Sequence, residues 1–261
     1  MQISARGYQQ IVHKTAQILS VELPSEYVDQ IQHADEVAAA IAEIAATPAL
    51  TAALHNAVID AISEGRDYRT DKRIQQLLTS RELAASNISQ TARTRAESEL
   101  RETLVEHSQR ILAGWSDALT EHSAALSAAA EAGLNLGNTS AVVAKGGDDM
   151  RLLHDAQIAV TAWSAARAGF EALATVAGVN LAGPVPLIYT AAPSEEWVPA
   201  VEAAGAQRLD VSPWDLARRR IALALPTLAE YQGRLATFQA DRRQRQQEEE
   251  KQRAERLVNS W

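Results

Sequence analysis

Apolar residues along most of this chain recur every three to four positions, the spacing that places them on one face of an α-helix. In the N-terminal quarter the runs cover residues 8–19, 25–44 and 50–62. Ser25 and the Thr47-Pro48 pair stand where helix-starting residues are expected, and Gly65 stands where a helix end is expected. The pattern predicts a helical N-terminal unit over residues 1–65.

Residues 70–132 contain no proline, and Gly114 is the only glycine in that stretch. The stretch can therefore form one helix of about 60 residues. Two series of residues repeat at an interval of eleven, the period of a nearly straight packing seam. They are Leu100, Ile111 and His122, and Leu104, Trp115 and Leu126.

A glycine-containing loop at 133–149 precedes a second helical pattern at 150–177. This second helix is long enough to fold back along the first, which predicts a helical hairpin over residues 66–180. We expect the first helix to pack against the second, or against another copy of the chain. Leu104, Ile111 and Trp115 are the predicted contact residues.

Residues 181–212 differ in character, since 186–189 and 207–211 have strand-like composition and flank a helical pattern at 194–204. They predict a small β-α-β-like element. Residues 213–261 then predict a C-terminal helix, with Ser212 as its cap and a kink at Pro226, followed by a charged tail. The predicted fold class is mainly α, an elongated helical bundle with coiled-coil-like long helices and this small insertion.

The chain ends on a small apolar cluster after several turns of charge. Between Phe238 and Leu257 the only nonpolar side chains are alanines, and Val258 and Trp261 follow. A charged helix cannot bury itself, so Leu257, Val258 and Trp261 are predicted to contact another chain. The alternative is that this tip folds back on the chain's own helices.

Composition narrows the class of protein. The net charge is −8, aromatic residues make up 5% and alanine about a fifth, which favours close helix pairing over a thick aromatic core. No run is long and apolar enough for a membrane span, and no signal-peptide pattern opens the chain. The absence of cysteine excludes disulfides, thiolate zinc sites and a cysteine nucleophile. We expect a cytoplasmic protein, or one in a phage particle assembled in the host cytoplasm.

No sequence motif predicts an enzyme, a metal or a cofactor. Phosphate-binding glycine loops, the G-x-S-x-G elbow and HExxH are all missing. Asp148, Asp149, His154 and Asp155 form the densest group of metal-ligand residue types, but Asp148 or Asp149 is explained as the N-cap of the following helix. His107 and His122 lie about 22 Å apart on one helix and cannot share a metal.

Three function classes are compatible with these observations. The favoured one is a structural or assembly protein with protein partners or self-association, such as an actinobacterial phage virion or capsid-assembly component. An arginine excess, with only four lysines among 25 basic residues, indicates a GC-rich genome of this kind.

The alternatives are a peripheral regulatory protein and an enzyme. The first would bind a membrane surface or nucleic acid through amphipathic helices or through Arg218–Arg220 and Arg242–Arg245, which the interspersed acids and negative charge disfavour. The second would use Tyr189, Asp210 or Asp215 with a neighbouring arginine at the small element.

Overall fold

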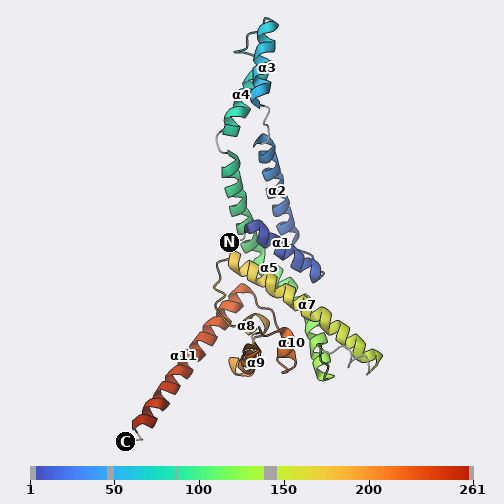
Figure 1. Ribbon diagram of the computed structural model, residues 1–261, viewed down its shortest axis with the longest axis vertical. Coiled ribbons are helices and arrows are strands. Elements are labelled where there is room, and N and C mark those ends of the chain that lie inside the picture. The colour runs from blue at the N-terminus through green and yellow to red at the C-terminus, as the bar shows by residue number, and fades with distance from the viewer. Residues whose placement is uncertain (1–3, 46–49, 86–87, 138–145, 208, 259–261) are drawn as a thin grey trace. The chain divides into compact units, whose positions relative to one another are not determined.

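The computed structural model describes residues 4–45, 50–85, 88–137, 146–207 and 209–258 (Figure 1). At 41–45, 50, 83–85, 88–89 and 253–258 only the backbone is described. Helices and loops account for all of these residues, and no strand occurs among them. The predicted mainly α class is confirmed.

The chain divides into two compact units. The first comprises residues 1–6 and 25–103, and the second comprises residues 7–24 and 104–261. Both α1 and α5 cross the boundary between them. The four-part division expected from sequence stays a prediction.

Three helices form where the N-terminal pattern predicts them. They are α1 (Ala5–Ile18), α2 (Ser25–Ala45) and α3 (Leu50–Ser63). Residues 46–49, which include the predicted Thr47-Pro48 start, lie outside the described residues. Within the first unit the backbone N–H of Ala5 donates to the Glu97 carboxylate, and Arg6 pairs with Asp35 of α2.

Two helices occupy the stretch predicted to be one. They are α4 (Lys72–Ala85) and α5 (Ile88–Glu131). Residues 86 and 87 between them are not described, so an uninterrupted helix stays a prediction there. The predicted returning helix is α7 (Gly147–Val176). Gly146 occupies its N-cap position, which corrects the prediction that Asp148 or Asp149 does so; both lie in its first turn, where the helix dipole favours acids.

The predicted β-α-β-like element is wrong in its strands. Residues 186–189 form a short helix, α8 (Pro186–Tyr189), because Pro186 supplies the fixed φ of a first helical turn and the Thr190 N–H bonds back to its carbonyl. The middle helix is correct as α9 (Ser194–Ala206). Of residues 207–211, those described lie in a turn and loop, since no neighbouring extended segment pairs with them.

The C-terminal helix is also divided. Ser212 and Asp215 form the predicted capping box of α10, but this helix spans only Pro213–Ala217. Arg220 then adopts a left-handed conformation with φ 61°, which ends helical geometry well before Pro226. A second helix, α11 (Leu228–Val258), starts from Thr227, whose hydroxyl accepts from the Glu230 N–H. The predicted kink at Pro226 is therefore a loop.

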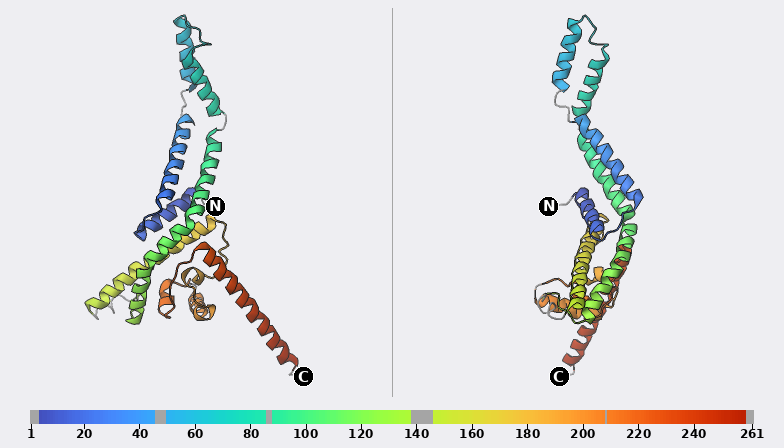
Figure 2. Two further views of the ribbon diagram at one scale, coloured as in Figure 1. Left: turned by 180° about the vertical axis from the view of Figure 1, so that it is seen from behind. Right: turned by 90° about the vertical axis from the view of Figure 1, so that its right-hand side faces the viewer.

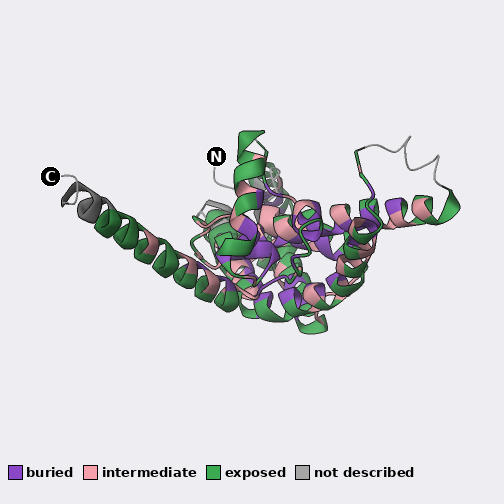
Figure 3. Cartoon of the chain, turned by 90° about the horizontal axis from the view of Figure 1, so that it is seen from below, coloured by how far each residue is buried: buried purple, intermediate pink, exposed green. Residues whose placement is uncertain are grey.

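The core of the second unit forms where α1, the later part of α5 and α7 meet. Trp115 and Trp163 are fully buried there, and the Thr15 hydroxyl donates to the Ala165 carbonyl of α7 at 3.0 Å. Burial is concentrated in this region, whereas the far part of α11 is exposed (Figure 3). None of the described helices is both long and apolar enough to cross a membrane.

Candidate functional site

The first unit contains a helical hairpin in which α3 and α4 lie side by side (Figure 2). Its turn is fixed by short-range bonds: Gly65 has φ 70°, the Arg66 N–H donates to the Ala61 carbonyl at 2.8 Å, and the Asp71 carboxylate accepts from the Arg73 N–H at 2.9 Å. The guanidinium of Arg66 pairs with both Glu64 and Asp71. The turn end of the hairpin is therefore held by a defined set of hydrogen bonds and ion pairs.

Only part of the apolar surface of α3 is covered by α4. The hairpin's buried cluster consists of Leu54, Ala57, Ala61 and Ile74, with Val58 and Leu77 packed against it. At about 100° per residue, the apolar positions of α3 span an arc of roughly 200°, about twice the stripe that one neighbouring helix covers. Ile59 keeps 59% of its surface exposed and Leu78 of α4 keeps 41%.

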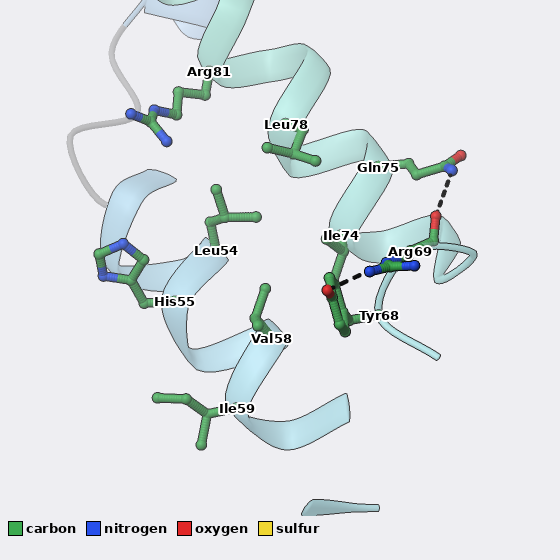
Figure 4. Close-up of a pocket in the computed structure, with 10 residues that line it drawn as sticks. All are labelled: Leu54, His55, Val58, Ile59, Tyr68, Arg69, Ile74, Gln75, Leu78 and Arg81. Atoms are coloured by element: carbon green, nitrogen blue, oxygen red, sulfur yellow. Dashed lines mark hydrogen bonds between the residues drawn. The ribbon is translucent and has the colours of Figure 1, made fainter. Parts of the chain in front are cut away.

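The uncovered part of this arc is one wall of a groove of about 690 Å³ between the two helices. Figure 4 shows Leu54 and Val58 of α3 directed toward α4, and Leu78 directed back toward α3. We call this site the hairpin groove. Its lining residues are Leu54, His55, Val58, Ile59, Tyr68, Arg69, Ile74, Gln75, Leu78 and Arg81.

Two arginines mark the groove's ends, and no aspartate or glutamate belongs to its described lining. Arg81 lies at the end near Leu54, and Arg69 lies at the other end beside Tyr68 (Figure 4). The Arg69 side chain is held over the Tyr68 ring, with Cζ 5.6 Å from the ring centroid and Nε donating to the phenol oxygen at 3.3 Å. Its carbonyl accepts from Gln75 at 3.0 Å. The groove is thus apolar along its length and cationic at both ends.

The partner-contact residues predicted on the long helix are inside the molecule. Leu104, Ile111 and Trp115 are all buried in the second unit. The Trp115 ring lies against α7 so closely that a Cβ added to Gly169 would come within 2.5 Å of it. Of the two packing partners expected for this face, the chain's own α7 is therefore the one in contact with Trp115.

The predicted contact residues of the tail lie outside the described side chains. The backbone of α11 includes Leu257 and Val258, whereas Trp261 is not described at all. Their contact with another chain stays a prediction. The polar and charged positions 246–252 before them are exposed, as expected for a solvated helix.

The first part of α11 is an internal support of the second unit. Arg234 donates through Nη1 to the carbonyls of Leu187, Thr190 and Ala224 at 2.9–3.2 Å, and burial lowers the pKa of its guanidinium. Further along, the Arg245 guanidinium donates to the Ser194 hydroxyl at 2.8 Å. One of the arginines considered for nucleic-acid binding is thus engaged within the chain.

The residues of the enzyme alternative are partly brought together. Arg167 of α7 pairs with Glu171 at 2.7 Å and Asp210 at 3.2 Å, and it also bonds the Tyr189 phenol. Burial raises the pKa of Tyr189 despite this cation, so the phenol stays protonated at neutral pH and is no base. Asp215 is occupied in the α10 capping box. This arrangement is an ion-pair network that joins α7 to the loop before α10.

The histidine and acid positions considered for metals stay separate. His107 is buried on α5, whereas His122 is half-buried and His154 is exposed. Among the described residues, no three histidine, aspartate or glutamate side chains are placed to share an ion.

No family model, curated protein or solved structure matches the chain.

The hairpin groove was missed at the level of sequence, although a signal for it exists. The periodic apolar positions of α3 were assigned to one face, whereas Ile59 lies beside that face and widens it. Such widening indicates a helix that has two neighbours. The roles of Arg69 and Arg81 could not be predicted from the sequence, because only the folded hairpin places them at the two ends of one groove.

Proposed function

We propose that this chain is a structural or assembly protein that acts through protein–protein contacts, and that the hairpin groove is a docking surface for a protein partner. The observation that carries the proposal is the pair Ile59 of α3 and Leu78 of α4, two exposed apolar side chains that line the groove of a hairpin with a fixed turn. An apolar groove that the described part of the chain leaves uncovered is a candidate interaction site. From the arginine-rich composition we propose a phage virion or capsid-assembly setting.

Burial gives a physical reason for docking. At about 25 cal/mol per Å² of apolar surface removed from water, covering the exposed parts of Ile59 and Leu78 contributes on the order of 1 kcal/mol each. The remaining wall adds to this, and the groove geometry defines where a partner lies. A hairpin of two short helices has marginal stability alone, so the partner also stabilises the hairpin.

The absence of cysteine makes a direct test available. Leu78 and Val37 have the same exposed fraction, 41%, but only Leu78 lines the groove. Each is replaced by cysteine in separate single variants, and maleimide labelling is compared between the purified chain and the cells that naturally produce it. Leu78→Cys should be protected in cells, while Val37→Cys should label equally in both settings. Equal labelling of Leu78→Cys in both settings would contradict the proposal.

A further inference from the structure

We infer that the occupant of the hairpin groove is an amphipathic α-helix of another protein, with carboxylates near both ends of its apolar stripe. This inference rests on the proposed docking function and names the chemistry of the partner. Three observations support it. They are the width of the apolar arc on α3, the two arginines at the groove's ends and the lack of an aspartate or glutamate in the described lining.

The groove geometry selects a helix. The arc on α3 has room for a second neighbouring helix beside α4, and a third helix laid into the furrow between two others completes a small bundle. A β-strand would bring unpaired backbone N–H and C=O groups against helices, whose own backbone groups are already bonded. A helix satisfies its backbone internally and presents apolar residues one turn apart to Val58, Ile59 and Leu78.

The charges select an acidic partner. Arg69 and Arg81 lie at opposite ends, and no aspartate or glutamate belongs to the described lining. Outside the lining, the Asp67 carboxylate accepts from the Arg69 backbone N–H at 3.0 Å. Arg81 belongs to α4, whereas Arg69 lies in the turn before this helix begins at Lys72. A helix with glutamates or aspartates near both ends of its apolar stripe therefore meets both arginines while the stripe covers the groove.

Two occupants from this chain fit less well. A second copy of the same hairpin, laid groove to groove, would bring arginines against arginines at the groove's ends. The charged part of α11 carries acids at Glu248–Glu250, but it contains no apolar side chain larger than alanine between Phe238 and Leu257. It therefore lacks the stripe that the groove requires.

The test uses the full chain and two labelled synthetic helical peptides of about 14 residues. Both carry leucines at i, i+3, i+4 and i+7; one has glutamates at both ends and the other has lysines there. Fluorescence anisotropy at low salt should show the acidic peptide binding about five- to tenfold more tightly, with the difference shrinking at high salt. Arg81→Glu should reduce or reverse this preference.

Ile59→Asp should weaken binding of the acidic peptide by more than about tenfold. Ile59 is more exposed than Leu78, the other exposed apolar residue of the groove. Val37→Asp is the matched control, and circular dichroism verifies that each variant is folded. Failure of the acidic peptide to bind, or equal binding of both peptides at low salt, would overturn the inference. Concentration-dependent self-association that Ile59→Asp abolishes would also overturn it, by identifying a second copy as the occupant.

The two proposals fail separately. If Leu78→Cys is protected in cells but the acidic peptide has no advantage, the docking function stands and the acidic-helix inference falls. If Leu78→Cys is fully labelled in cells, the docking function itself falls.

Discussion

Gly169 lies where α7 passes closest to its neighbours in the second unit. A Cβ at this position would come within 2.5 Å of the Trp115 ring and 2.8 Å of the Thr15 hydroxyl oxygen. Gly169→Ala should therefore lower the free energy of unfolding by about 1 to 3 kcal/mol, because neither neighbour is the free end of a flexible side chain. Urea denaturation measures the change.

Gly205 of α9 provides the control for that substitution. It has no atom within 4 Å of the added Cβ, so Gly205→Ala should be neutral or stabilising by up to about 1 kcal/mol. Equal effects of the two substitutions would show that the close approach of α7 to Trp115 is absent in solution.

His13 of α1 gives the second unit a pH-dependent contribution to stability. Burial lowers the pKa of its imidazole below the ordinary value of 6.5, so the unfolded chain takes up the proton first as the pH falls. The unfolded state then binds more protons, and stability decreases as the pH drops from 6.5 through the lower folded pKa. His13→Gln should show a flatter decline in melting temperature between about pH 7 and 5. Parallel declines for both proteins would contradict this assignment.

At the scale of elements, α11 is held to the second unit mainly through Arg234 and the aromatic contacts beside it. Phe238 packs on Trp197 and Tyr231 packs on Phe170, with ring centroids 5.4 and 5.3 Å apart. Arg234→Met keeps the aliphatic stem but leaves the three carbonyls without their donor. The expected loss is about 1 to 3 kcal/mol in the free energy of unfolding.

Arg243→Met is the matched control for Arg234→Met. Arg243 lies in the exposed part of α11, so its replacement should change the free energy of unfolding by less than about 0.5 kcal/mol. Thermal melts that give the same loss for both variants would mean that the contacts of Arg234 with the three carbonyls do not hold α11.

The helices were predictable from sequence where periodicity and end signals agreed. α2 begins at Ser25, and Ser212 with Asp215 caps α10, because capping is a local interaction. The sequence predicts a strand at 186–189, because a short apolar run is compatible with a strand or with a helix. The structure has a helix there, α8, with Pro186 in its first turn. Helical geometry after α10 ends where Arg220 adopts a left-handed conformation. Such a position is usually marked by a glycine in the sequence, but here the residue is an arginine.

The candidate site was less predictable than the helices that form it. The apolar residues of α3 were recognised as a helix face, but the exposure of Ile59 and Leu78 depends on which part of that face α4 covers. Conversely, Leu104 and Trp115 have the same apolar character and are buried, with the Trp115 ring against Gly169 of α7. Apolar residue type shows that a position requires a neighbour, whereas only packing shows whether the neighbour belongs to the same chain.

At the scale of the whole molecule, the two units differ in how far their apolar residues are buried. The second unit buries its large aromatic residues, including Trp115, Trp163 and Trp197, in its own core. The first unit carries the hairpin groove, whose apolar wall is left exposed. The expected docking of Leu257, Val258 and Trp261 would add a second contact surface on the second unit, and it stays a prediction.

The central claim is that the hairpin groove places this chain in a larger assembly. The most direct measurement is sedimentation of extracts from the producing cells, with the wild-type chain compared with the double variant Ile59→Asp/Leu78→Asp and with the matched control Val37→Asp. The wild-type and control chains should sediment in large complexes, while the double variant, folded by circular dichroism, should shift to the position of the free chain. Sedimentation of the double variant with the same large complexes would contradict the account.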